Sequence, residues 1–427
     1  MFEPTKYTLL NVSSGDVFQD EGWSLNYPES KTPSLIRAIY ESKTLSLRDD
    51  EKGMYKFADW LPLRRHLSCE SSPVTFRSEG LATALELKNL WITFNGYFPK
   101  VGANMTTCSF KETEAYSVCA RAKEDDRVLV VSSAGNTARA FAKVCSDNSI
   151  KLLLCVPEDN LDALWFEKEL NPCVKLICAA KGADYFDAIH LGDIAVKSKL
   201  FYAEGGAKNV ARRDGMGTTV LSAVTTIGYI PDYYFQAVGS GTGAIAAWEA
   251  CLRLREDGRF GNKMMKLFVS QNDPFLPMYE AFMQDSRELL PYDAKKARAD
   301  VEVIDAKVLS NRKPPYSIAG GLFDALKATN GAVLKAPNAD ARTAADLFER
   351  LEGIDIHPAA AVATASLIKA VKEGLVDKNS CIMLNITGGG QKLFQKGKKL
   401  WYLKPDFIFG LDPDENDVIK KAESLFR

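Results

Sequence analysis

The chain has 427 residues, of which 46% are apolar and 26% are charged. Lysine and arginine together number 54, against 55 aspartate and glutamate residues, so the formal net charge is −1. This balance excludes a general electrostatic attraction to nucleic acid or membranes, and the length predicts two domains.

The amino-terminal stretch MFEPTKYTLL contains Glu3 and lacks the apolar core of a secretory signal. No apolar run approaches the roughly 18–20 residues that a membrane-spanning helix needs. The nine cysteines form no CxxC pair, which argues against a zinc site and against a disulfide framework. We therefore expect a cytoplasmic protein without metal, with buried thiols at Cys69, Cys108, Cys119, Cys145, Cys155, Cys173, Cys178, Cys251 and Cys381.

The first 65 residues differ in character from the rest. The stretch GDVFQDEGWSLNYPES at 15–30 is polar and rich in turn residues. We expect residues 1–65 to form an amino-terminal extension that leads into the domains.

Lys111 is the next feature, within TTCSFKETEA at 106–115. It stands between a loop with glycine and asparagine and a helix-like run. A lysine in such a place is most often a solvated charge at a helix start. The motif by itself does not decide between that and a catalytic amine.

From residue 127 onward, strand-like and helix-like segments alternate. Such alternation predicts an α/β fold with parallel sheets covered by helices on both faces. The expected strands are 128–133, 151–156, 174–179, 199–204, 232–238, 266–270, 331–337 and 381–386, and the expected helices are 136–144, 184–198, 244–256, 340–353 and 359–374.

Three turns follow expected strands. SSAGNTARA at 132–140 offers backbone amides and the Asn136 side chain at a helix start. GSGTG at 239–243 lets amides approach a phosphate closely, but it is neither a Walker motif nor GxGxxG. TGGGQK begins at Thr387. Each turn alone is often a simple connector between strand and helix.

The combination is more informative than its parts. A lysine, a glycine-rich phosphate cup and two polar turns are what a pyridoxal-phosphate enzyme requires. The lysine would form the Schiff base, the cup would hold the 5′-phosphate, and a turn side chain would meet the ring nitrogen. We therefore expect pyridoxal 5′-phosphate as the cofactor.

The chain resembles fold-type-II pyridoxal-phosphate enzymes, which have the tryptophan synthase β-like fold, and within them the threonine synthase branch. The resemblance runs from about Tyr7 to Tyr402. It implies two parallel-sheet domains with the cofactor in the cleft between them. The expected division is 1–65 for the extension, 66–112 with 216–427 for a large cofactor-binding domain, and 113–215 for a small domain.

The resemblance also implies roles for single residues. SFK looks like the Schiff-base motif, which makes Lys111 the catalytic lysine. Asn136 would bond the ring hydroxyl, and Thr387 the pyridine nitrogen. The 5′-phosphate would be held by Gly239, Ser240, Gly241, Thr242 and Gly243.

The chain departs from threonine synthases in ways that point to a narrower family. Those enzymes usually continue the motif as Phe-Lys-Asp-Arg, whereas Glu112 and Thr113 follow Lys111 here. The long strings FNGYFPKVGANMTTCSFKE, EGGAKNVARRDGMGTT and NRKPPYSIAGGLFDAL resemble cysteate synthases of methanogenic archaea. An acidic residue is expected where His357 stands, and we assign His357 no catalytic role.

The implied reaction is a β-replacement in which O-phospho-L-serine and sulfite give L-cysteate and phosphate, a step toward coenzyme M. Both substrates are anions, so the cleft needs cations. Lys100 and Arg139 lie close in sequence to the Lys111 and Asn136 motifs. The expected substrate contacts are Ser132, Ser133, Ala134, Gly135, Lys208, Arg212 and Arg213.

Two other classes of function stay open at this point. One is another enzyme of the same fold, such as threonine synthase acting on phosphohomoserine or a serine/threonine dehydratase. The other is a binding or regulatory descendant without catalysis, against which the intact Lys111, Asn136 and Thr387 argue. We also expect a homo-oligomer.

Overall fold

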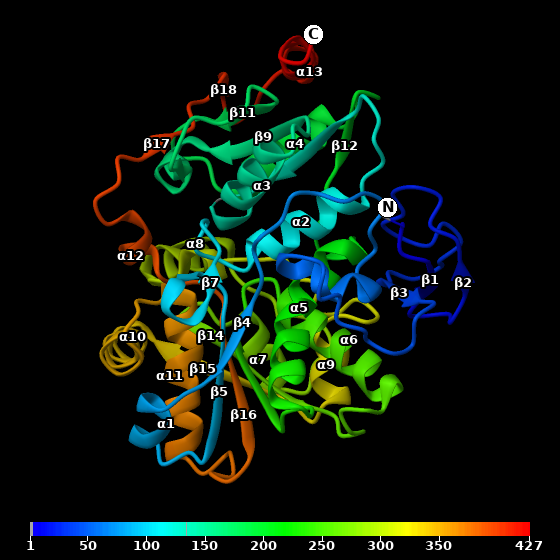
Figure 1. Cartoon of the computed structure of the whole chain (residues 1–427). Helices are drawn as coiled ribbons and strands as arrows, with labels where there is room; N and C mark the ends of the chain where they lie inside the picture. The colour runs from blue at the N-terminus through cyan, green and yellow to red at the C-terminus, as the bar shows by residue number, and fades with distance from the viewer. Residues whose placement is uncertain (1–2, 134) are drawn as a thin grey trace.

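The computed structural model describes residues 3–133 and 135–427. Its two main sheets are built mostly from parallel strands, and helices pack on both faces of each sheet (Figure 1). In the view of Figure 1, the five-stranded sheet lies at the top near the carboxyl terminus, and the six-stranded sheet lies below it. The predicted α/β fold with two parallel-sheet units is confirmed.

The larger sheet has the strand order β15-β14-β13-β16-β5-β4. Strand β4 runs antiparallel to β5, and the other neighbours are parallel. Its strands are β4 (Val74–Arg77), β5 (Asn89–Phe94), β13 (Tyr233–Ala237), β14 (Lys266–Asp273), β15 (Ala332–Pro337) and β16 (Cys381–Ile386).

Alternating side chains of β13 enter two different cores. Tyr234 packs into one core and Phe235 into the other, as the two-residue period of a strand requires. Both faces are therefore buried, which explains why these strands read as continuous apolar runs. One face is covered by α5 (Val210–Ile227), α6 (Thr242–Asp257), α7 (Pro277–Met283) and α9 (Leu322–Ala328), and the other by α1 (Gly80–Ala84), α10 (Asn338–Glu352) and α11 (Pro358–Lys372).

The smaller sheet has the order β12-β8-β9-β11-β18, with all neighbours parallel. Helix α3 (Asn136–Asp147) packs on one face, and α4 (Tyr185–Ala195) and α13 (Glu415–Ser424) pack on the other. Helix α2 (Lys111–Arg121) contacts both α3 and α5, so it joins the two units. The strands are β8 (Val128–Ser132), β9 (Leu152–Pro157), β11 (Val174–Ala179), β12 (Phe201–Ala203) and β18 (Phe407–Phe409).

The end of the chain differs from the expected division. Residues 216–427 were expected in the large domain, but β18 pairs with β11 and α13 packs on α4, so the chain returns to the small sheet. Phe409 is buried there with Val418 of α13. A three-residue strand is too short for its period to be recognised in the sequence, which is why this return was not predicted.

The first 65 residues are more ordered than the composition indicated. They form an antiparallel sheet of β1 (Tyr7–Asn11), β2 (Val17–Phe18) and β3 (Ile36–Tyr40), followed by the 3-10 helix η1 (Gly53–Trp60). Leu9 and Ile36 are buried in the same core as α5 and α6. The segment therefore packs as part of the large unit.

All the strands and helices predicted from residue 127 onward are present, with ends that differ by a few residues. The remaining elements are β6 (Tyr97–Phe98), β7 (Ala103–Asn104), β10 (Trp165–Phe166), β17 (Trp401–Tyr402), α8 (Ala294–Val303), α12 (Gln391–Gln395), η2 (Pro99–Val101), η3 (Glu158–Ala163), η4 (Gly206–Lys208) and η5 (Lys307–Leu309).

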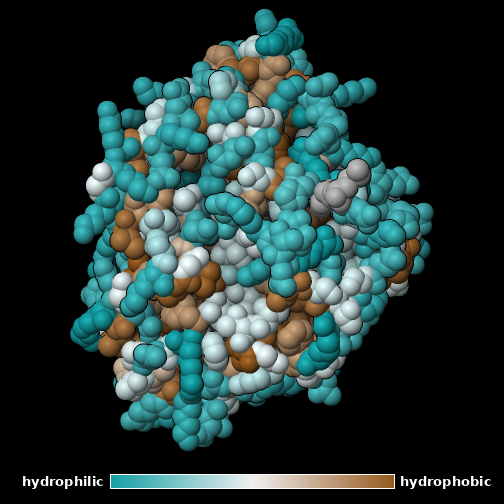
Figure 2. Space-filling view, viewed as in Figure 1, coloured by the Kyte–Doolittle hydropathy of each residue, from teal (hydrophilic) through white to brown (hydrophobic). Residues whose placement is uncertain are grey.

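Hydrophilic residues cover most of the face shown in Figure 2. Across residues 3–133 and 135–427, no helix combines the length and apolar character that crossing a bilayer demands.

A buried ion pair fastens the amino-terminal segment to helix α2. Arg121 is fully buried and donates from Nε and Nη2 to Asp20 Oδ2, at 3.0 and 2.9 Å. Tyr7 Oη donates to the same oxygen at 2.6 Å. Burial by itself raises the pKa of Asp20, but Arg121 and the hydrogen bonds from Tyr7 and the Ser24 amide together hold it well below its usual range.

We predict that Asp20→Asn lowers the free energy of unfolding by about 3–5 kcal/mol, because it leaves the Arg121 guanidinium buried without a carboxylate. The pKa of Asp20 is depressed in the folded state, so its contribution is complete above the unfolded value of about 4 and is lost as the pH falls through the folded value. Urea denaturation at pH 7 and at lower pH measures both effects. The exposed neighbour Glu21, changed to Gln, is the control, and equal loss in both variants would contradict the prediction.

Candidate functional site

Lys111 is the first residue of α2, directly after the loop that carries the SFK motif. Its side chain is 20% exposed, and Nζ donates to Glu114 Oε2 at 2.9 Å. Burial lowers the pKa of Lys111, and Glu114 partly opposes that shift. A lowered pKa increases the share of neutral amine, the form that attacks a carbonyl. The partly buried position and the lowered pKa of Lys111 are the properties expected of a nucleophilic amine.

The turn after β16 lies against the loop that precedes Lys111. Phe110 N donates to Thr387 O at 3.0 Å, and Gly389 N donates to Cys108 O at 3.1 Å. A Cβ at Gly390 would lie 1.8 Å from Tyr97 O, and its φ is +75°, so the turn requires glycine there. The predicted Thr387 is therefore brought next to Lys111.

The glycine turn between β13 and α6 opens at the same edge of the sheet. Strands β13 and β16 are parallel neighbours, so the turns at their carboxyl ends lie side by side. A Cβ on Gly239 would lie 2.7 Å from Val308 O, and Gly241 has a φ of +77°. The residue that precedes α6, Gly241, has no side chain to cap the helix, and Ser240 Oγ accepts from the first amide, Thr242 N, at 3.3 Å. These features fit a phosphate bound by backbone amides at a helix amino terminus.

Asn136 begins α3 and is tied to the Lys111 loop through Arg139. Arg139 Nη2 donates to Asn136 Oδ1 at 2.7 Å and to Thr107 O at 3.0 Å. Ser133 Oγ accepts hydrogen bonds from the amides of Gly135 and Ala138, both at 3.2 Å. The turn thus faces the segment that leads into Lys111.

Two of the substrate contacts expected in this turn, Ala134 and Ser132, are not supported by the geometry of the described residues. Ala134 lies outside the described residues. Ser132 Oγ lies 2.3 Å from where a Cβ at Gly192 would be, so its side chain faces α4 rather than α3. Since successive side chains of a strand alternate, Ser132 and Ser133 point to opposite faces. The structure does not support the expectation for the Ser132 side chain.

Of the three predicted cations in one short stretch, Arg212 is the one linked to Lys111. Its Nη2 lies 2.5 Å from Glu114 Oε1, on the carboxylate that also accepts from Lys111, and its Nη1 donates to Glu204 Oε2 at 2.7 Å. Burial alone would lower the pKa of Arg212, but the two carboxylates raise it. Arg212 is therefore a permanent positive charge beside the lysine.

Arg213 and Lys208 are placed differently. Arg213 is fully buried and donates to Glu249 Oε2 at 2.9 Å and to the carbonyl oxygens of Ala207 and Ile36. Adjacent helical residues point about 100° apart, so Arg212 and Arg213 enter different surroundings. Lys208 is exposed in η4. The structure does not support a substrate contact for Arg213.

Two acidic residues of the site were not predicted. Glu114 is three residues after Lys111 on α2, and this spacing places both side chains on one helix face, which is a signal the sequence carries. Glu204 follows β12 and is 5% exposed. Nothing local distinguishes it from a surface glutamate in a glycine-rich loop.

His357 is the residue before α11, and its amide donates to Gly388 O at 2.9 Å. Burial, with a smaller contribution from Arg139, lowers the pKa of His357 to about 4. The imidazole is therefore neutral near pH 7. It packs against the Thr387 turn, since its Nδ1 would lie 2.4 Å from a Cβ at Gly388.

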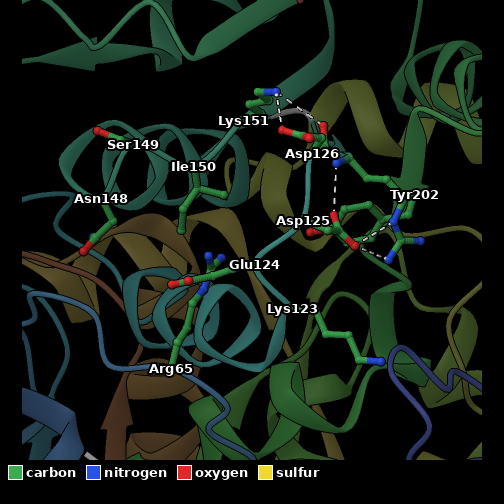
Figure 3. A pocket seen from close by; sticks show the side chains of 11 residues that line it. Arg65, Lys123, Glu124, Asp125, Asp126, Asn148, Ser149, Ile150, Lys151 and Tyr202 are labelled. Atoms are coloured by element: carbon green, nitrogen blue, oxygen red, sulfur yellow. Dashed lines mark hydrogen bonds and ion pairs between the residues drawn. The ribbon is translucent and has the colours of Figure 1, made fainter.

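A separate hollow of about 490 Å³ lies at the opposite edge of the small sheet (Figure 3). Arg127 and Lys151 border it, just before β8 and β9 begin, whereas Asn136 follows the other end of β8. Four of its charged side chains form two ion pairs, Arg127 with Asp125 and Lys151 with Asp126. This hollow is not the site that contains Lys111.

Comparisons with known proteins agree with this geometry. The family model described as pyridoxal-phosphate dependent enzyme matches residues 82–388. The chain is 48% identical to cysteate synthase of Methanosarcina acetivorans, over 89% of this chain and 92% of that one. It is 47% identical to cysteate synthase of Methanocella arvoryzae, over 97% and 99%.

Solved structures show the same fold at low identity. Maize serine racemase has a TM-score of 0.56 at 12% identity, covering 74% of this chain and 88% of that chain. A hydrogen sulfide-producing enzyme from Fusobacterium nucleatum has a TM-score of 0.53 at 14% identity, covering 75% and 96%.

We predict that Gly239→Ala weakens cofactor binding about tenfold to a hundredfold, because its Cβ would displace the turn and cost about one charge-assisted hydrogen bond of roughly 1.5–3 kcal/mol. Fluorescence titration of the apoprotein with pyridoxal phosphate measures the dissociation constant. Gly410→Ala is the control, since its Cβ would meet open space. Equal affinities in the two variants would show that the turn does not hold the phosphate.

Proposed function

The chain belongs to the pyridoxal-phosphate-dependent enzymes, and within them to the cysteate synthases, and we propose that it replaces the phosphate of O-phospho-L-serine with sulfite. The Cβ–O bond to phosphate breaks and a Cβ–S bond to sulfite forms, which gives L-cysteate and inorganic phosphate. This would be a step toward coenzyme M. The support is similarity over nearly the whole length of the relatives, together with a partly buried lysine at the sheet edge where two glycine turns lie side by side.

Lys111 would hold the cofactor through Nζ until the substrate amine displaces it. Its freed amine would then remove the proton from the substrate Cα and return a proton there after sulfite has added. The lowered pKa of Lys111 favours both tasks, because an amine must be neutral to accept a proton. Bound pyridoxal phosphate supplies the conjugated ring that accepts the electron pair left on Cα.

The surrounding residues would orient the cofactor. The amides of residues 239–243 would bind its phosphate, and Asn136 would donate to its ring oxygen. Thr387 would meet the ring nitrogen with a neutral hydroxyl. A neutral partner leaves that nitrogen unprotonated, which suits elimination and addition better than transamination. The closeness of Thr387 to Lys111 supports this arrangement.

Arg212 would bind an anionic group of the substrates. It is the cation connected to Lys111 through a shared carboxylate, and its planar guanidinium can form two parallel hydrogen bonds to phosphate or sulfonate oxygens. The turn at Ser133 and Gly135 would take the substrate carboxylate, with the Gly135 amide exchanging its hydrogen bond to Ser133 Oγ for one to the substrate. A net charge of −1 for the whole chain is therefore compatible with a local positive charge at Arg212.

The reaction is tested directly with purified holoenzyme. We predict that O-phospho-L-serine and sulfite yield cysteate, with one phosphate released per cysteate formed. Phosphate release is followed colorimetrically and cysteate by mass spectrometry, each with and without sulfite. Threonine formation from phosphohomoserine, with no sulfite-dependent product, would instead identify a threonine synthase.

We predict that Arg212→Gln lowers kcat/KM for O-phospho-L-serine about tenfold to a hundredfold, since a hydrogen bond to a charged group contributes roughly 1.5–3 kcal/mol. The absorption spectrum of the lysine-bound cofactor should stay unchanged, which separates substrate binding from cofactor binding. Lys199→Gln, an exposed cation before β12, is the control. Equal kcat/KM in both variants would exclude Arg212 as a substrate contact.

A further inference from the structure

Arg212 lies between two buried carboxylates that come from different elements. Glu114 on α2 lies 2.5 Å from its Nη2, and Glu204 after β12 accepts from its Nη1 at 2.7 Å. The side chains of Glu114 and Glu204 are 0% and 6% exposed. Lys111 donates to the second oxygen of Glu114. The four side chains form a cluster that we call the Arg212 cluster.

The charges of the Arg212 cluster balance while Lys111 carries its proton. Two cations then face two carboxylates. If Lys111 held the cofactor, it would no longer supply an ammonium group to Glu114, and Arg212 would be the remaining cation between the two buried carboxylates of this cluster. Burying an uncompensated charge costs several kcal/mol, so this arrangement favours protonation of one carboxylate. An anion arriving at Arg212 strengthens that tendency, because it competes for the same guanidinium donors.

Glu204 is the better candidate to take the proton. Its Oε2 accepts from Arg212 and from Gly206 N at 3.0 Å, but within the described part of the chain neither a donor nor a cation reaches its buried Oε1. Glu114 Oε1 also lacks a well-aligned hydrogen bond, but Arg212 Nη2 lies 2.5 Å from it. Burial and the nearby Glu114 raise the pKa of Glu204 more than Arg212 and Lys111 lower it, and the result is a pKa of about 7. The phenol of Tyr185 on α4 also faces the Arg212 cluster, and burial keeps it neutral by raising its pKa.

We propose that Glu204 is a proton-linked counter-ion of Arg212, holding the guanidinium while the anion subsite is empty and taking one proton from solvent when an anionic substrate binds there. The Arg212–Glu204 ion pair is replaced by an Arg212–anion pair, and no covalent bond to the protein changes. The neutral carboxyl no longer repels the anion and gains an O–H that can donate to it. Release of the product anion returns the proton to solvent. This inference rests on the proposed function, which makes Arg212 a contact for anionic substrates.

The proposal predicts a definite pH dependence. Below the pKa of about 7, Glu204 is already mostly neutral, so the protein takes up few protons per anion bound. Above it, proton uptake approaches one per anion, and anion affinity falls as the pH rises. For a single group of that pKa, the apparent dissociation constant increases about tenfold between pH 6 and pH 8.

Sulfate is the appropriate probe, because phosphate and sulfite titrate in this range themselves, whereas sulfate keeps its charge. Isothermal titration calorimetry of the holoenzyme is done at pH 6 and pH 8, each in two buffers of different ionisation enthalpy. The difference between buffers gives the protons taken up per sulfate. In the holoenzyme the bound cofactor already occupies the phosphate cup, so sulfate reports on the substrate anion subsite.

We expect nearly one proton per sulfate at pH 8 for the wild type and close to none for Glu204→Gln, whose affinity should change little between the two pH values. Asp193→Asn is the matched control, because burial also raises the pKa of this α4 carboxyl, eight residues beyond Tyr185. It should take up protons as the wild type does. Arg212→Gln should bind sulfate at least tenfold more weakly at pH 6.

Three results would overturn the proposal. Sulfate binding by the wild type without proton uptake at pH 8 excludes the linkage, whatever the variants do. Uptake that persists in Glu204→Gln but disappears in Glu114→Gln assigns the proton to Glu114. Sulfate affinity that does not depend on Arg212 excludes the subsite. A holoenzyme that forms cysteate yet shows any of these results contradicts this inference alone, whereas failure to form cysteate contradicts the proposed function.

Discussion

The antiparallel pairing of residues 108–110 with 387–389 is the constraint on which the site depends. Phe110 N bonds to Thr387 O, and Gly389 N bonds to Cys108 O. Thr387 directly follows the central strand β16, and Phe110 directly precedes Lys111, so these two bonds fix the lysine at the carboxyl edge of the large sheet. The pairing leaves no room for a side chain at Gly388, where a Cβ would lie 2.4 Å from His357 Nδ1. The glycines after Thr387 are therefore needed for packing, whatever their part in catalysis.

The second unit is held over this edge by contacts from distant parts of the chain. Arg139 of α3 donates to Thr107 O and stacks over Trp165 at 4.2 Å, which ties the start of α3 to the Lys111 loop. Helix α2 contacts both α3 and α5, and its far end is anchored by the buried pair of Arg121 and Asp20. The amino-terminal segment thus supports the helix that carries Lys111. A polar, turn-rich composition gave no indication of this support, because it comes from tertiary contacts.

The strands and helices from residue 127 onward could be predicted because the hydrophobic pattern of each is contained in a short stretch of sequence. Buried parallel strands read as short apolar runs, and the turns after them carry the glycines that a phosphate requires. Lys111, Asn136 and Thr387 could be proposed as site residues because each stands in a recognisable short motif. Arg212 and Arg213 could not be told apart in the same way, since their difference arises from the direction each takes around α5. Glu204 and the return of β18 depend on contacts between segments far apart in sequence, and no single window contains them.

The Arg212 cluster shows how a chain of net charge −1 can present a cation to anionic substrates without leaving a buried charge uncompensated. A guanidinium with no partner in a 14% exposed position would lose much of its hydration, which is costly before any substrate arrives. Two carboxylates remove that cost, but they also compete with the substrate for the same donors. A permanently ionised pair would therefore weaken the anion site that it stabilises. A carboxyl with its pKa near neutrality avoids the conflict, because it can be charged when the site is empty and neutral when the site is filled. The surroundings of each carboxyl decide which one can do this. Both oxygens of Glu114 face a cation, Lys111 at Oε2 and Arg212 at Oε1, whereas within the described residues neither a cation nor a hydrogen-bond donor reaches Glu204 Oε1.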